Sequence, residues 1–70
     1  MDPKALFGRQ VRLLRSALGV SQEMLAEKAK CHRTFVGQVE RGETNVSLEN
    51  IVKLAHALGV PPSKLLDKIK

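Results

Sequence analysis

Apolar residues recur along the chain at helical spacing, without the strict alternation of a half-buried strand. Five segments carry this pattern, and short runs with glycine, proline or a capping serine separate them. The expected helices cover residues 3–18, 22–29, 33–40, 48–58 and a stretch from 62 to about 69. No repeat, linker or low-complexity tract interrupts them. The pattern predicts an all-α fold, a compact five-helix bundle in a single domain over residues 1–70.

Start and stop signals bound these helices. Asp2 before Pro3 is an acidic cap followed by proline at the first helical position, where its missing N–H costs nothing. Ser21 and Ser47 are placed to cap the second and fourth helices. Gly19 follows the first helix, where a left-handed residue commonly ends a helix.

Each helix has an apolar arc that we expect to face the core. In the first helix the arginines Arg9 and Arg12 fall opposite this arc, at about 100° per residue. The expected core residues are Leu6, Phe7, Leu13, Leu14, Ala17 and Leu18 in the first helix, Leu25, Ala26 and Ala29 in the second, Phe35, Val36 and Val39 in the third, Leu48, Ile51, Val52, Leu54, Ala55 and Leu58 in the fourth, and Leu65, Leu66 and Ile69 in the fifth.

Composition narrows the function classes. Twelve basic and seven acidic residues give a net charge of +5, which favours a polyanionic partner such as nucleic acid. A single cysteine cannot form an internal disulfide, and no cysteine and histidine residues have the spacing of zinc ligands. We therefore expect neither a disulfide nor a metal, and a reducing cytosol as the environment. No membrane span or signal peptide is expected, and two phenylalanines are too few to stack single-stranded bases. No catalytic set or glycine-rich phosphate loop is recognisable, so we expect no enzyme, cofactor or small-molecule ligand.

Residues 22–41 form a two-helix unit. Counted from Gln22, the small residue Ala26 is fifth, and the β-branched Val36 and Val39 are fifteenth and eighteenth. Two helices that cross steeply need a small residue at their contact and apolar residues behind it. This spacing is typical of a helix-turn-helix.

The outward side of the third helix carries groups that can read DNA. Arg33 can make a bidentate contact with guanine and Gln38 with adenine, and Thr34 adds a hydroxyl. Gly37 lies on the same side, although glycine inside a helix costs about 1 kcal/mol relative to alanine. A close approach of its backbone to the DNA groove explains that cost. The alternative is that Gly37 is incidental on an ordinary polar face.

Three segments together resemble the Cro/C1-type helix-turn-helix family: SQEMLAEKA at 21–29, VGQVERG at 36–42 and AHALGV at 55–60. The resemblance extends from about Phe7 to Leu66. It implies a lambda-repressor-like DNA-binding domain that acts as a transcriptional repressor or activator, usually as a dimer on a palindromic operator. Small stand-alone regulators are most similar, including restriction–modification controller proteins and short phage or plasmid repressors. A cytoplasmic protein encoded by a bacterium or phage is implied.

The resemblance also implies roles for individual residues. Base reading falls to Arg33, Thr34 and Gln38, with Gly37 approaching the groove through its backbone. Gln22 contacts a phosphate and braces the third helix. Further phosphate contacts fall to Arg41, Thr44 and Asn45, and Arg15 and Glu40 form a structural salt bridge.

The turn departs from the family pattern. Lys30 stands where glycine is usual, and a positive φ there costs on the order of 1 kcal/mol. His32 stands where serine or threonine caps the third helix. Alternatively, both side chains point towards the DNA backbone. We expect Cys31 to be a half-buried filler, since a redox role requires a lowered thiol pKa.

The C-terminal third carries more apolar residues than a short terminal helix can bury. We therefore expect a homodimer held by Leu58, Leu65, Leu66 and Ile69. The alternative function is a protein-interaction module, antitoxin-like or coactivator-type, which requires apolar anchors on the third helix. RNA binding is disfavoured because a helix cannot read the narrow major groove of A-form RNA.

Overall fold

The first helix begins where the Asp2 side chain accepts a hydrogen bond of 2.8 Å from the backbone N–H of Lys4, directly before Pro3. The computed structural model describes residues 2–70. Its helices are α1 (Pro3–Leu18), α2 (Gln22–Ala29), α3 (Arg33–Glu40), α4 (Leu48–Leu58) and α5 (Pro62–Leu65). Ser21 and Ser47 cap α2 and α4 as predicted. Residues 2–70 contain no strand. The all-α fold and the first four helices are confirmed, whereas α5 is a single turn.

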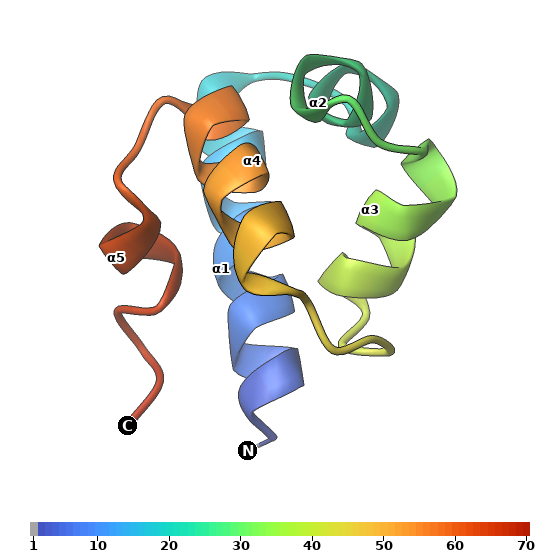
Figure 1. Cartoon of the computed structure of the whole chain (residues 1–70). Helices are drawn as coiled ribbons and strands as arrows, with labels where there is room; N and C mark the ends of the chain where they lie inside the picture. The colour runs from blue at the N-terminus through green and yellow to red at the C-terminus, as the bar shows by residue number, and fades with distance from the viewer. Residues whose placement is uncertain (1) are drawn as a thin grey trace.

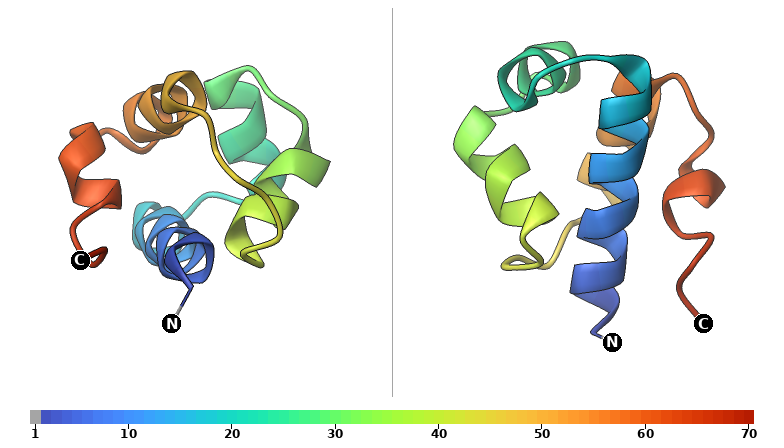
Figure 2. Two further views of the ribbon diagram at one scale, coloured as in Figure 1. Left: turned by 60° about the horizontal axis from the view of Figure 1, so that its bottom comes forward. Right: turned by 180° about the vertical axis from the view of Figure 1, so that it is seen from behind.

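The helices surround one core. Figure 2 (left) shows α1 and α4 on opposite sides of the molecule, with α3 and α5 on the two remaining sides. α2 lies at the end opposite both termini (Figure 1). The buried apolar residues come from all five helices: Phe7, Val11, Leu25, Ala26, Ala29, Val36, Val39, Leu54, Ala55, Leu58 and Leu65.

The predicted core faces of α1 and α4 need correction. Phe7 and Val11 are buried in α1, while Leu13 is 60% exposed, and Ala17 and Leu18 are exposed as well. Leu48, in the first turn of α4, is 74% exposed. The predicted arc of α1 omitted Val11. The buried stripe is instead the side of α1 on which α3, α4 and α5 pack, and it includes Phe7 and Val11 but not Leu13.

α1 and α3 cross at Gly8. A Cβ atom at this position would lie 2.1 Å from the backbone oxygen of Val39 and 2.9 Å from that of Glu40. Glycine therefore allows the two backbones to approach. On another side of α1, the buried Gln10 donates its Nε2 hydrogen to the backbone oxygen of Lys64 at 3.1 Å, which ties α1 to α5.

The expected dimer contacts are also corrected. Leu58 and Leu65 are buried inside the protomer's own core, so neither can meet a second chain in the folded state. Leu65 is fully buried on α5, which packs against α4 and α1. Leu66 is 40% exposed, and Ile69 packs half-buried against the core. Among residues 2–70, no helix combines the length and apolar character that crossing a membrane demands.

Candidate nucleic-acid interface

The turn between α2 and α3 adopts the predicted geometry. Lys30 has φ 58° and ψ 47°, the left-handed conformation expected at a glycine position. The following N–H, of Cys31, donates to the backbone oxygen of Ala26 at 2.9 Å and closes the end of α2. His32 precedes α3 without a capping hydrogen bond from its side chain. Both Lys30 and His32 are exposed.

α3 presents a polar face to solvent and buries an apolar one. Val36 and Val39 are buried against the core, and Phe35 is half-buried. On the outward side lie the exposed side chains of the three predicted base-reading residues, Arg33, Thr34 and Gln38. The structure thus brings the predicted readers together on one helix face.

Arg33 is held by a residue of α2. Its Nη1 donates to Oε2 of Glu23 at 3.0 Å, and the side chains are 73% and 70% exposed, respectively. Exposed pairs of this kind contribute about 0–1 kcal/mol to stability. The pair therefore orients Arg33 across the turn. A ligand that displaces Glu23 from Arg33 loses little stabilising energy.

Arg41 covers Gly37, which corrects the expectation that Gly37 lies open to the groove. Gly37 is buried, and a Cβ atom built on it would lie 3.0 Å from Nη1 of Arg41. Glu43 accepts a hydrogen bond of 2.9 Å from Nε of Arg41. This hydrogen bond raises the pKa of Arg41 and lowers that of Glu43, and the attraction between the charges acts in the same direction.

A buried ion pair braces α3 against α1 and α2. Nε of Arg15 donates to Oε2 of Glu40 at 2.6 Å, and Nη2 donates to Oε1 at 3.1 Å, so the predicted salt bridge is present. The hydrogen bond to Glu40 raises the pKa of Arg15, against the opposing effect of burial. Gln22 also donates to Oε1 of Glu40, at 3.0 Å, which links the start of α2 to the end of α3. Arg15 further donates to the backbone oxygen of Val20 at 2.9 Å.

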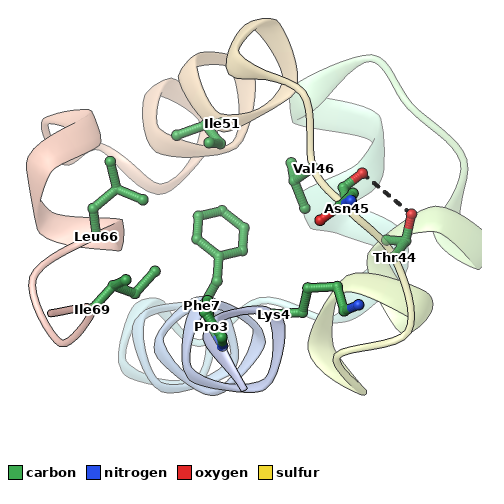
Figure 3. Close-up of a pocket in the computed structure, with 9 residues that line it drawn as sticks. All are labelled: Pro3, Lys4, Phe7, Thr44, Asn45, Val46, Ile51, Leu66 and Ile69. Carbon is green, nitrogen blue, oxygen red and sulfur yellow. Dashed lines mark hydrogen bonds between the residues drawn. The ribbon is translucent and has the colours of Figure 1, made fainter. Parts of the chain in front are cut away.

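Thr44 and Asn45 lie in the loop that follows α3. They line a hollow of about 130 Å³, into which Phe7 points (Figure 3). Thr44 donates through its hydroxyl to the backbone oxygen of Asn45 at 3.3 Å. Leu66 and Ile69 form the opposite wall of this hollow. The loop therefore rests on the core between α1 and α4, and Asn45 is exposed.

Cys31 lies half-buried beside the turn, as expected. Burial raises the pKa of its thiol, and the positive charge of Lys53 opposes this effect. A reactive cysteine needs a lowered pKa, so the surroundings of Cys31 give no support to a redox role. Across residues 2–70, no three histidine, cysteine or acidic side chains are grouped so that they could hold a metal ion.

Two carboxylates near the predicted base-reading residues, those of Glu43 and Glu23, were not predicted from the sequence as partners of Arg41 and Arg33. Glu43 stands two residues after Arg41, a spacing that could have suggested their pairing. Glu23 and Arg33 are ten residues apart on different helices, and no local pattern marks such a contact. Gly8 was also missed, although glycine in the middle of a predicted helix is itself a signal of close packing.

Known proteins resemble this chain in sequence and in fold. Residues 11–65 match the helix-turn-helix family HTH_3. The chain is 51% identical over 65 residues to the control protein C.BamHI of Bacillus amyloliquefaciens, across 91% of this chain and 80% of that protein. The restriction–modification controller protein C.AhdI from Aeromonas hydrophila has a similar crystal structure, with a TM-score of 0.87 and 52% identity, covering 89% of this chain and 94% of the other. The P22 c2 repressor, crystallised with a synthetic operator, gives a TM-score of 0.80 and 32% identity, covering 86% and 91%, respectively.

Proposed function

The chain belongs to the helix-turn-helix family HTH_3 of transcriptional regulators, and we propose that it binds a palindromic DNA operator as a homodimer, with α3 lying in the major groove. The observation that carries this proposal is the polar face of α3. Arg33, Thr34 and Gln38 are exposed there, on a helix held firmly by buried contacts on its other side. A major groove admits an α-helix, and arginine and glutamine match guanine and adenine edges.

Phosphate contacts flank this face. We assign them to Gln22 at the start of α2 and to Thr44 and Asn45 after α3. Such contacts supply affinity and fix the orientation of α3, while the contacts to bases supply sequence preference. The net charge of +5 supports binding to a polyanion. The amide nitrogen of Gln22 donates the hydrogen bond to Glu40, and this bond holds the Gln22 side chain beside α3.

The homodimer is proposed to form through the exposed part of the C-terminal segment. Leu66 is the exposed leucine there, and half-buried Ile69 lies beside it along the same hollow. Two-fold symmetry requires half-site centres about 10 base pairs apart, so that both copies of α3 enter the groove on one side of the duplex. An operator with this spacing is part of the proposal.

The similarity to C.BamHI and C.AhdI supports a narrower role, the control of restriction–modification genes. A restriction endonuclease gene beside the gene of this protein is the expected context. The protein-interaction alternative gains nothing from the structure, because the exposed side of α3 carries Arg33, Thr34 and Gln38 in place of apolar anchors.

Selection of bound sequences from random duplexes tests the proposal. We expect a palindrome with the stated spacing, bound more tightly than a scrambled duplex, with an affinity that falls steeply as salt rises. An Arg33→Ala variant should lose the preference at one base pair in each half-site. Leu66→Asp should weaken dimerisation in sedimentation equilibrium, whereas Leu18→Asp, at the far end of α1, should not. Binding without sequence preference, or a monomer on the selected DNA, would contradict the proposal.

A further inference from the structure

Arg41 lies where it can take part in base reading. It follows the last residue of α3, yet its guanidinium folds back over Gly37, one turn towards the start of that helix. Long side chains on a helix commonly point in this direction. Position 37 lies between Arg33, Thr34 and Gln38 on the outward face, since residues three and four apart are neighbours on a helix surface. The guanidinium therefore sits within the face that the readers form.

The absence of a side chain at Gly37 creates the space for this arrangement. A Cβ atom at that position would already lie 3.0 Å from Nη1 of Arg41, so any longer side chain would occupy the place of the guanidinium. Glycine inside a helix is unfavourable by about 1 kcal/mol relative to alanine. A requirement for this space explains why glycine stands here.

Glu43 orients the group. It accepts the hydrogen bond from Nε at 2.9 Å, which leaves Nη1 and Nη2 as the nitrogens that can be presented to a ligand. Two parallel N–H donors of arginine match the O6 and N7 acceptors of guanine. The guanidinium lies about one helical turn, roughly 6 Å, from the level of Arg33 along α3. That distance corresponds to about two base-pair steps of DNA.

We infer that Arg41 reads a second guanine and does not serve as the phosphate contact expected from the family resemblance. Its guanidinium occupies the space that Gly37 leaves open, and Glu43 orients it there. The inference rests on the proposed function, because it requires α3 to enter the major groove. It makes Arg41 a specificity-determining residue and Glu43 its positioning residue. Gly37 then contributes by having no side chain, and its backbone need not approach the DNA.

A panel of duplexes tests the inference, each with one base pair of the selected operator replaced. Arg41→Ala should abolish discrimination at one base pair per half-site, a loss of about 5- to 150-fold in preference. This base pair should differ from the one affected by Arg33→Ala. Arg41→Lys should behave similarly, since lysine keeps the charge without the bidentate geometry. Glu43→Ala should weaken the same preference, whatever its effect on overall affinity.

Gly37 provides the matched control. Gly37→Met should remove the preference at the same base pair as Arg41→Ala, because the methionine side chain occupies the space of the Arg41 guanidinium. Methionine favours the helix, so the variant should fold. Gly37→Ala, which displaces the guanidinium only slightly, should have a smaller effect. In the Arg41→Ala background, Gly37→Met should change that preference no further.

The outcomes separate the roles. If Arg41→Ala weakens binding equally on every duplex and lowers the salt slope by about one unit, Arg41 contacts a phosphate and the inference is wrong. It is also wrong if Gly37→Met leaves every base preference intact. If the unmodified protein prefers no sequence at all, the proposed function itself fails, which the panel reveals before any variant is tested.

Discussion

Glu40 on α3 accepts hydrogen bonds from two nitrogens of Arg15 on α1, and its side chain is only 4% exposed. Removing one partner of such a buried pair leaves the other charge uncompensated, which costs about 3–5 kcal/mol. We expect Arg15→Met to lower the free energy of unfolding by about 3 kcal/mol, as measured by urea denaturation.

The double variant Arg15→Met/Glu40→Met is the control for this prediction. Apolar replacement of both partners of a buried pair is often neutral or stabilising, so the double variant should recover much of the loss. Gln22 then loses its acceptor, which keeps recovery incomplete. If Arg15→Met unfolds at the same urea concentration as the parent, the pair does not stabilise the contact between α1 and α3.

Gly8 and Gly37 make a matched pair of helical glycines. A Cβ atom at Gly8 would meet the backbone oxygen of Val39 at 2.1 Å, whereas at Gly37 it would meet the flexible end of Arg41 at 3.0 Å. Gly8→Ala must separate α1 from α3 and should cost about 1–3 kcal/mol or more. Gly37→Ala should stabilise the fold by up to about 1 kcal/mol.

Thermal denaturation of both variants checks this contrast. One kcal/mol corresponds to a shift in Tm of about 4–8 °C in a domain of this size. Equal shifts in the same direction would show that helix propensity alone governs both sites, and that α1 and α3 can adjust at their crossing.

Helix limits could be predicted because local chemistry determines them, as Ser21 and Ser47 cap helices through their own hydroxyls. The left-handed turn at Lys30 was expected from the glycine position of the family pattern. The salt bridge between Arg15 and Glu40 followed from the family resemblance and not from spacing. These features depend on few neighbours or on a shared motif.

The core face of α1 and the surroundings of the arginines could not be predicted in the same way. The predicted arc of α1 included Leu13 and omitted Val11, yet Val11 is buried and Leu13 is exposed, because burial depends on which helices cover α1. Arg33 and Arg41 have long side chains whose positions depend on Glu23 and Glu43. The residues that we propose face DNA were therefore predictable as positions on a helix, but the contacts of their side chains were not.

Lys30 is strained by its left-handed backbone, with φ 58°. A side chain in this conformation costs about 1–2 kcal/mol, and glycine avoids the cost. Lys30→Gly should therefore raise the free energy of unfolding by about 1 kcal/mol. Lys30→Ala, which removes the charge but keeps the Cβ atom, should not stabilise the fold. Equal stabilisation by both variants would attribute the effect to charge and not to backbone strain.

Cys31 should react slowly with alkylating reagents. Burial raises the pKa of its thiol, and the thiolate is the reactive species. We expect iodoacetamide to modify the folded protein more slowly at neutral pH than the protein unfolded in urea. The rate should continue to increase with pH beyond the ordinary range of a cysteine. Modification of folded and unfolded protein at equal rates would contradict a protected thiol.

Glu23 places a negative charge beside the surface that we propose meets DNA, and it holds Arg33 at 3.0 Å. Because both side chains are exposed, the pair contributes about 0–1 kcal/mol to stability, so Glu23→Gln should fold normally. It should bind operator and scrambled duplexes more tightly by a similar factor, since repulsion from phosphates is removed. The base preference should stay unchanged, because Arg33 is still present to read its base pair.

Asp67→Asn is the matched control for Glu23→Gln, since it removes the same charge from the segment after α5, on the side of the molecule opposite α3 (Figure 2). Because Asp67 adjoins Leu66 in the proposed dimer segment, sedimentation equilibrium should first show that this variant dimerises as the parent does. Binding titrations at several salt concentrations should show a smaller gain in affinity for this variant than for Glu23→Gln. Arg33→Ala, in contrast, should cost about 1–3 kcal/mol on the operator and little on scrambled DNA. If Glu23→Gln loses operator preference as Arg33→Ala does, the ion pair persists in the complex and Glu23 positions Arg33 on its base. If Asp67→Asn matches the gain of Glu23→Gln, the effect reflects net charge and not the location of Glu23.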